Sequence, residues 1–332
     1  MPYFSVIVPV YNRTDEVKDL LESLSKQTDK DFEVIIVEDG STIPCEKEVR
    51  EYKDSLAIKY FHKSNEGRSI ARNFGIEHAQ GNYFIFFDSD CIIPPDYFKK
   101  LAKELKDNYA YCFGGPDAAH DSFSDVQKAI NYSMTSFLTT GGIRGGKIKL
   151  DKFVPRSFNM GYSREVWKKV GGFREMFSED IDMSTRIRQA GYSIRLIRDA
   201  YVYHKRRVNL RLFLRQIYVF GMSRITLYLL YPDSLKAVHL LPSLFTVTSA
   251  IMIILAVFWH WWAILPLVAY IIALFVSAFM QTKNIKISFI AIITSFIQLY
   301  GYGTGFITAF IRKILLGKGR NIEEEIKIRK GK

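Results

Sequence analysis

Two aspartates separated by one serine, Asp88 and Asp90, end the aromatic run "FIFFDSD" at residues 84–90. Carboxylates at this spacing can both reach one hard cation, such as magnesium or manganese, and leave coordination sites for water and phosphate oxygens. The alternative is that they only shape a turn before the two prolines that follow. The pattern therefore indicates either a metal-bound diphosphate or a plain turn.

Two other stretches carry side chains that could serve the same ligand. Asp39 follows an apolar run and precedes Gly40, where it can accept hydrogen bonds from a base or ribose, or form an Asx turn. Arg68 and Arg72 are four residues apart and share one helix face. That face suits a phosphate, although a solvated basic surface is the alternative.

A third stretch, "SEDIDMSTRIRQAGY", places acids at the start of an expected helix. Ser178 is positioned to cap that helix, and Glu179 and Asp180 fall in its first turn. The helix dipole favours acids at this position even when they have no catalytic role.

The elements that must position these residues alternate along the chain. The runs "SVIVPV", "FEVIIVE", "AIKYFH" and "YFIFF" are short, β-branched or aromatic, and helix-like stretches separate them. This alternation predicts the α/β class, with a mostly parallel sheet flanked by helices. Ligands of such sheets bind beyond the carboxyl ends of the strands, where the loops after these four runs converge.

From Val238 onward the chain becomes strongly apolar. Residues 238–280 contain two stretches of about 20 residues without Lys, Arg, Asp or Glu, which is the length of a bilayer crossing. The cluster "FWHWW" between them is typical of a membrane interface, so the stretches predict a two-span hairpin. The predicted organisation is a cytosolic catalytic domain over 1–204, basic juxtamembrane amphipathic helices over 205–236, a membrane region over 237–314 and a charged tail over 315–332.

A third apolar stretch, residues 287–311, is long enough to cross a membrane but is interrupted by glycine. Lys283 and Lys286 precede it, and Arg312 and Lys313 follow it. Both groups are cytoplasmic by the positive-inside rule, whereas a full crossing would separate them. A re-entrant or interfacial segment would explain this, as would three spans that break the rule.

Charge and cysteine content exclude several classes of site. The net charge of +12 is concentrated beside the membrane region, in "HKRRVNLRLFLR", which indicates anionic lipid as a partner and not nucleic acid. The three cysteines have no CxxC spacing, which argues against a zinc site or a disulfide framework. "MPYFSVIVPV" has no basic leader or cleavage site, so the N-terminal part is expected in the cytosol.

Five segments in matching order resemble the signatures of the family 2 glycosyltransferases. They are "SVIVPVYNR", "EVIIVEDGS", "NEGRSIARNFGIEHAQGNYFIFFDSD", "GGFREMFSEDIDMSTRIRQAGY" and "VYH", over about residues 3 to 225. The resemblance implies a glycosyltransferase A-type nucleotide-binding sheet, a nucleotide-sugar donor, a divalent metal (magnesium or manganese) and inversion at the anomeric carbon.

The resemblance also implies roles for individual residues. Pro9, Tyr11 and Asp39 would hold the nucleoside, and Glu38, which departs from the aspartate commonest there, would lie beside them. Arg68, Arg72 and Asp88 would face the diphosphate. The metal would be held by Asp88 and Asp90, with His204 as a third candidate ligand. Asp180 would be the base that deprotonates the acceptor, supported by Glu179, because inversion requires a base opposite the leaving diphosphate.

Two weaker features concern the acceptor side. "GGIRGGKI" at 141–148 lacks the Ser or Thr of a P-loop and is expected to be a mobile loop over the acceptor cleft. Asn159 is expected near the acceptor, or as a turn residue. "RQIYVFGMSR" departs from the Gln-x-x-Arg-Trp signature of processive synthases, which favours addition of one sugar per encounter.

The predicted function is a membrane-anchored inverting glycosyltransferase. It would move a sugar from a UDP- or GDP-sugar to a lipid-linked or membrane-proximal glycan acceptor, in surface polysaccharide assembly. Its predicted location is the inner membrane, multi-pass, with the catalytic domain cytoplasmic. The alternatives are transfer to a polyisoprenyl phosphate and a catalytically silent sugar-nucleotide-binding scaffold.

Overall fold

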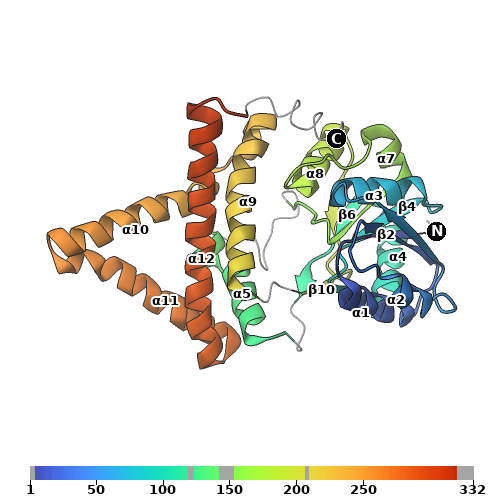
Figure 1. Ribbon diagram of the computed structural model, residues 1–332, viewed down its shortest axis with the longest axis horizontal. Coiled ribbons are helices and arrows are strands. Elements are labelled where there is room, and N and C mark those ends of the chain that lie inside the picture. The colour runs from blue at the N-terminus through green and yellow to red at the C-terminus, as the bar shows by residue number, and fades with distance from the viewer. Residues whose placement is uncertain (1–3, 119–122, 142–152, 206–208, 320–332) are drawn as a thin grey trace. The chain divides into compact units, whose positions relative to one another are not determined.

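The computed structural model describes residues 4–118, 123–141, 153–205 and 209–319, which belong to two compact units (Figure 1). The sheet unit comprises Met1–His120 and Lys149–Lys205, and the helical unit comprises Asp121–Ile148 and Arg206–Lys332. The predicted division at residue 204 placed 121–148 with the catalytic part, whereas the structure groups this segment with the C-terminal helices.

The sheet unit is built on a seven-stranded sheet of order β3-β2-β1-β4-β8-β6-β9. The strands are β1 (Phe4–Val10), β2 (Phe32–Asp39), β3 (Ile58–Lys63), β4 (Tyr83–Phe87), β6 (Cys112–Gly114), β8 (Asn159–Ser163) and β9 (Ile194–Leu196). The first four strands pair in parallel, and β8 runs antiparallel to both β4 and β6. The mixed, mostly parallel α/β sheet agrees with the predicted class.

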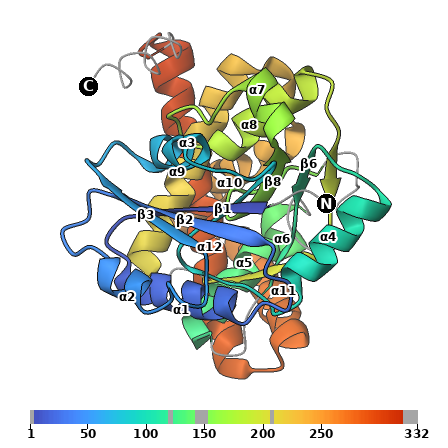
Figure 2. The same ribbon diagram turned by 90° about the vertical axis from the view of Figure 1, so that its right-hand side faces the viewer.

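Both faces of this sheet are buried, which explains the nearly continuous apolar strand sequences. Val6, Val8 and Ile85 pack on one face with α1 (Thr14–Ser25), α2 (Glu46–Arg50) and α4 (Tyr97–Asp107). Ile7 and Phe84 pack on the other face with α3 (Arg68–Glu77), α7 (Arg164–Val170) and α8 (Glu179–Gln189). Figure 2 shows α3 on one side of the sheet and α1 and α2 on the other.

A small second sheet has the order β5-β10-β7. Its strands are β5 (Cys91–Ile92), β7 (Asp117–Ala118) and β10 (Val202–His204). The pairing of His204 with Cys91 brings the end of β10 beside the residue that follows Asp90. Two segments more than 110 residues apart therefore meet at the predicted metal site.

The helical unit contains α5 (Asp125–Thr135), α6 (Phe137–Thr140), α9 (Leu210–Leu230), α10 (Leu241–Phe258), α11 (Leu265–Thr282) and α12 (Ile285–Ala309). Short 3-10 turns lie at Pro232–Ser234, Ala237–His239 and Trp261–Ile264, and a π-helical turn, Phe310–Leu315, extends α12. In the part of the chain that the structure describes, three helices are long and apolar enough to cross a membrane: Leu241–Phe258, Trp261–Thr282 and Ile285–Leu315.

The glycines of "GYGTG" do not interrupt α12, which is continuous over 25 residues. A Cβ atom on Gly305 would lie 2.1 Å from the carbonyl oxygen of Tyr218 in α9, and one on Gly221 would lie 2.2 Å from that of Tyr302. The glycines therefore allow the backbones of α9 and α12 to approach closely, as small residues do in membrane helix pairs.

Candidate active site

The candidate site lies at the carboxyl edge of the parallel strands. In the register of the sheet Val10 pairs with Glu38, and Asp39 pairs with Lys63, so β1, β2 and β3 end side by side. Asp88 directly follows β4, which pairs in parallel with β1. The loops after these four strands therefore meet at one edge, as the alternating sequence pattern predicts.

Asp39 organises the loop that follows β3. Its Oδ1 accepts hydrogen bonds from Lys63 Nζ (3.0 Å) and the Glu66 amide (3.0 Å), and its Oδ2 accepts one from the Gly67 amide (2.9 Å). Gly67 has φ +102°, and a Cβ there would also lie 2.6 Å from Glu175 Oε1. Asp39 is thus a buried residue that holds residues 63–67 against the strand ends.

Glu38 points to the other face of the strand, as alternation requires. It is fully buried and accepts hydrogen bonds from the Ser41 hydroxyl, the Cys45 amide (2.9 Å) and the Tyr60 hydroxyl (3.3 Å). Burial, and then the neighbouring Glu38 charge, raises the pKa of the Cys45 thiol and of Tyr60. These partners make Glu38 a support for the loop after β2.

Pro9 lies within β1, and Tyr11 directly follows that strand with 52% of its surface exposed. The next residue, Asn12, has a left-handed backbone with φ 53°. Its amide donates to the Ser41 hydroxyl (2.7 Å), and its Oδ1 accepts from the Thr42 amide (2.8 Å). The loops after β1 and β2 are therefore joined, which leaves the Tyr11 ring at the surface beside Asp39.

Arg72 links the two predicted carboxylate motifs. Its side chain is completely buried, and it donates from Nη1 to Glu179 Oε1 (2.9 Å) and from Nη2 to Asp88 Oδ1 (2.7 Å). Arg68, one turn earlier on α3, donates to Glu179 Oε2 at 2.8 Å and is 54% exposed. Both arginines lie on the predicted helix face, but only Arg68 is open to solvent.

Asp180 and Glu179 begin α8, as predicted. Asp180 Oδ2 lies 3.3 Å from Arg156 Nη1, and Glu179 is 2% exposed. Ser178 stands at the N-cap position, but the expected cap is wrong, because its left-handed backbone (φ 64°) gives no side-chain capping bond. A left-handed residue other than glycine costs about 1–3 kcal/mol and is typical of functional sites.

Asp90 and His204 form a cluster with ligand atoms for a cation. His204 Nε2 lies 3.0 Å from Asp90 Oδ1, and a potential ligand atom of Cys91 lies within 4.8 Å of both groups. The His204 ring stacks on Phe158 with centroids 4.3 Å apart. Burial raises the pKa of the Cys91 thiol well above its usual range.

Asp88 does not belong to this cluster, and one of its oxygens, Oδ1, pairs with Arg72 Nη2 at 2.7 Å. Carboxylate and imidazole are ligands that suit manganese or magnesium completed by water and phosphate oxygens. The chemistry of Asp90 and His204 therefore fits the predicted divalent ion, with Asp88 able to contribute only its other oxygen.

Three contributors could not be identified from sequence spacing. Arg156 pairs with Asp180 across 24 positions, and Lys63 pairs with Asp39 across the same number. Glu16 lies near Asp90: burial and then the Asp90 charge raise its pKa, while Arg13 at 2.6 Å opposes the shift. Its Oε2 is buried without a hydrogen-bond partner within the described residues. Of these three residues, only Lys63 offered a sequence signal for a place in the site, because it stands at the end of a strand.

Two predictions concern the acceptor side, the position of Asn159 and a loop at 141–148. Asn159 lies in β8 and not in a turn, is fully buried and bonds to the Tyr97 hydroxyl (2.6 Å) and the Ala200 carbonyl (2.8 Å), and its position near an acceptor stays a prediction. Its side-chain amide donates to the carbonyl of Ala200, two residues before β10, and so connects β8 of the large sheet to the small sheet. Of the predicted mobile loop at 141–148, all but Gly141 lies outside the described residues, as do Arg206 and Arg207 of the basic segment.

Comparison with known proteins agrees with this geometry. Residues 5–171, half of the chain, match the family model described as "Glycosyl transferase family 2". An uncharacterized glycosyltransferase of Rickettsia conorii is 42% identical over 141 residues, and glycosyltransferase GlyA of Streptococcus pneumoniae is 39% identical over 102 residues. These matches cover 42% and 30% of this chain, but only 22% and 15% of those two relatives.

Two solved structures share the fold. A mannosyltransferase from Pyrobaculum calidifontis, in complex with GDP-Man and Mn²⁺, superposes with a TM-score of 0.58 at 16% identity and covers 96% of this chain and 88% of its own. S. aureus TarS gives a TM-score of 0.50 at 23% identity and covers 73% of this chain and 42% of its own. With the sheet, its strand-end motifs and the family match in agreement, the chain belongs to the family 2 glycosyltransferases.

Proposed function

We propose that the chain is an inverting transferase that moves a sugar from a UDP- or GDP-sugar to a hydroxyl of a lipid-linked or membrane-proximal glycan, in surface polysaccharide assembly. The observation that supports it most is the double contact of Arg72. One buried guanidinium ties Asp88, on the donor side, to Glu179, the neighbour of Asp180. A protein that only binds sugar nucleotides would need the Asp88 and Asp90 pair alone. It has no need to hold a second pair, Glu179 and Asp180, against the first.

The donor would lie along the carboxyl edge of the sheet. The exposed Tyr11 ring would pack against the base, with Pro9 beneath it and Asp39 shaping the adjoining loop. Arg68, which is open to solvent, would meet the diphosphate, whereas the buried Arg72 would position Asp88 and not touch the donor. Glu38 would act only through the loop that it holds.

Asp90 and His204 would hold the divalent ion, with Asp88 contributing an oxygen toward the diphosphate. When bound, such an ion neutralises charge that develops on the leaving nucleoside diphosphate. The rest of the site would supply orientation, because Arg68 and Arg72 keep Glu179 ionically paired and fix the start of α8.

Asp180 would take the proton from the acceptor hydroxyl as its oxygen attacks the anomeric carbon from the face opposite the diphosphate. The bond from the acceptor oxygen to the anomeric carbon forms as the bond to the diphosphate breaks, which inverts that carbon. Arg156, at 3.3 Å from Asp180, would orient the carboxylate.

The acceptor is proposed to be membrane-bound because apolar helices follow the sheet unit in the chain. Arg211 and Arg215 in α9 would meet anionic lipid on the cytoplasmic leaflet of the inner membrane. A bare polyisoprenyl phosphate remains the rival acceptor.

The test is release of nucleoside diphosphate from a panel of UDP- and GDP-sugars in detergent with manganese and membrane lipid extract. GDP-mannose belongs in the panel because the Pyrobaculum structure holds it. Wild type and Asp180→Asn are compared, with donor binding measured separately. Turnover by wild type alone, with donor binding equal in both, is expected. Turnover with pure polyisoprenyl phosphate would favour the rival acceptor, and donor binding without turnover on any extract would favour the scaffold.

A further inference from the structure

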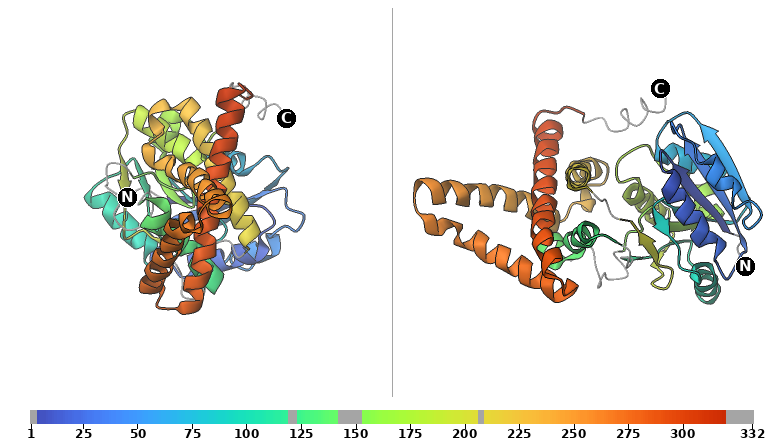
Figure 3. Two further views of the ribbon diagram at one scale, coloured as in Figure 1. Left: turned by 90° about the vertical axis from the view of Figure 1, so that its left-hand side faces the viewer. Right: turned by 60° about the horizontal axis from the view of Figure 1, so that its bottom comes forward.

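The three apolar helices of the helical unit are covered to different extents. Buried residues make up 6% of the most apolar window of Leu241–Phe258 and 11% of that of Trp261–Thr282, but 39% of that of Ile285–Leu315. Figure 3 shows α10 and α11 as a hairpin that projects from α12. The third helix is therefore covered by protein to a greater extent than the first two.

The hairpin contacts α12 at its two open ends and also further along, where Phe245 and Ser249 of α10 and Tyr270 of α11 meet Phe296 and Tyr300 of α12. At the start of α10, Ser243 Oγ lies 3.5 Å from the Gly303 carbonyl, toward the end of α12. In α11, Phe275 lies against Phe289, toward the start of α12, with ring centroids 4.9 Å apart and ring planes tilted by 50°. The helices α10, α11 and α12 thus form the sides of a triangle (Figure 1).

The tip of this triangle is apolar and exposed. Val257, Phe258, Trp259 and Trp261 are between 70% and 84% exposed. Lipid and its interface, where tryptophan is enriched, would cover such side chains. The hairpin-facing stripe of α12 is also apolar, with Phe289 59% and Ile293 53% exposed.

The opposite side of α12 packs on helices that carry charges. Thr294 donates to the Ala129 carbonyl of α5, whose first turns also hold Asp125 and Lys128. Lys286 and Asp125 form an ion pair at 2.9 Å. Thr294 is about 14 Å along the helix from Ile285, so a membrane-spanning α12 would keep Asp125 near the membrane edge but carry the α5 backbone at Ala129, and the polar residues that follow it, toward the bilayer centre. Such burial is strongly unfavourable.

We propose that only the α10–α11 hairpin crosses the bilayer, and that α12 lies along the cytoplasmic interface with both ends on the same side. The bilayer would cover the hairpin-facing stripe of α12, while α9 and α5 cover its water-facing side. This arrangement places Lys283 and Lys286 on the same side as Arg312 and Lys313, as the positive-inside rule requires. It rests on the proposed membrane anchoring, but not on the reaction.

The test uses single cysteines in the full-length chain: His260→Cys at the tip, Gln281→Cys at the end of α11 and Lys318→Cys beyond α12. All three positions are exposed, and the native Cys45, Cys91 and Cys112 are buried, so wild type gives the background. A membrane-impermeant maleimide is applied to spheroplasts and to inverted membrane vesicles of the expression host.

The expected result is labelling of residues 281 and 318 only in inverted vesicles and of residue 260 only in spheroplasts. Labelling of 281 and 318 from opposite sides would show that α12 spans and would overturn the inference. Labelling of all three from one side would show that the hairpin does not cross, with the same consequence. Met280→Cys and Leu316→Cys repeat the comparison with charge unchanged, and carbonate extraction verifies that each variant is inserted. Because no turnover is measured, a failed reaction assay leaves this result unaffected.

Discussion

The two edges of the parallel sheet treat buried carboxylates in opposite ways. At the amino edge Glu33 accepts hydrogen bonds from the Ser5 hydroxyl (2.7 Å) and the Gln80 amide (2.6 Å), and pairs with Lys59 at 2.8 Å. At the carboxyl edge Asp88 pairs with Arg72, a cation that it shares with Glu179. The Asp88 side chain remains 33% exposed. A carboxylate enclosed by donors stabilises the fold, whereas a carboxylate that stays partly exposed, as Asp88 does, can take a ligand.

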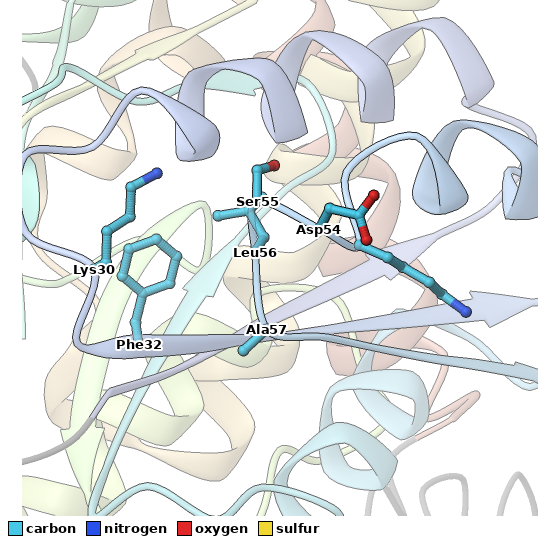
Figure 4. Close-up of a pocket in the computed structure, with 7 residues that line it drawn as sticks. Lys30, Phe32, Asp54, Ser55, Leu56 and Ala57 are labelled. Atoms are coloured by element: carbon cyan, nitrogen blue, oxygen red, sulfur yellow. The ribbon is translucent and has the colours of Figure 1, made fainter.

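The amino edge of the sheet also carries a surface hollow. Lys30, Phe32, Lys53, Asp54, Ser55, Leu56 and Ala57 line it, beside the starts of β2 and β3 (Figure 4). Its charged groups, Lys30, Lys53 and Asp54, do not converge on a buried partner in any contact described. A concave surface alone therefore does not indicate the reactive edge.

The largest expected effect is on Asp180→Asn, which removes the proposed base without removing volume. Turnover should fall by about 10²–10⁴-fold, because the amide cannot accept the acceptor proton. Steady-state release of nucleoside diphosphate measures it. The matched control is Asp182→Asn on the same helix, since Asp182 pairs with Arg174 and Arg186. That variant should lower the melting temperature more than the turnover, and the reverse ranking would refute the assignment.

Arg72→Lys should have the next largest effect. Lysine keeps the charge but cannot reach Asp88 and Glu179 together, so kcat should fall by about 10–100-fold with a smaller change in the donor KM. The control is Arg164→Lys at the amino edge, where Arg164 donates to the carbonyls of Gly81 and Ala79. It should lower stability and leave kcat near wild type. Equal losses of kcat in the two variants would mean that Arg72 is only structural.

His204→Ala should raise the manganese concentration for half-maximal turnover by about 10–100-fold, because one proposed ligand is lost while Asp90 remains. A manganese titration at saturating donor measures the shift. His62→Ala, an exposed residue on β3, serves as control and should titrate as wild type. An unchanged midpoint in the His204 variant would remove this histidine from the metal site.

The smallest effect on activity is expected for Glu33→Gln, which should leave kcat unchanged while lowering the free energy of unfolding by about 1–3 kcal/mol. Burial alone would raise the pKa of Glu33, but bonds from Lys59, the Gln80 amide and Ser5 outweigh it and lower the pKa below 4.5. The stabilisation is thus present above pH 4.5 and lost as the pH falls through the lower, folded-state pKa. Denaturant unfolding of both proteins from pH 7 to pH 3 should show the difference shrinking, and a constant difference would contradict this account.

The sequence was sufficient to predict the parallel strands and the edge where Asp39, Asp88 and Asp90 gather. Buried parallel strands have continuous apolar sequences, and their polar ends must meet at one side. It was insufficient for contacts between distant segments: Arg72 and Glu179 are 107 positions apart, and the buried bridge between them is the observation on which the proposed positioning role of Arg72 rests.

The glycines in α12 led to the wrong expectation of an interrupted helix, for a different reason. An isolated helix is weakened by glycine, since the unfolded backbone has more freedom to lose. In this chain Gly301 and Gly305 face α9, so close packing between helices compensates for that cost. Local propensity could not reveal the partner helix, nor could it place α5 in the helical unit.

The shared guanidinium of Arg72 also has a thermodynamic consequence. If the proposed divalent ion, bound with the donor, draws Asp88 away from Arg72, the electrostatic field that Arg72 offers to Glu179 changes, at the start of the helix that carries Asp180. Occupancy on one side then alters affinity on the other, and linkage requires that the factor be the same in both directions. Titrating acceptor with and without donor, and donor with and without acceptor, should return equal ratios, so that a single side chain would couple the two substrate sites.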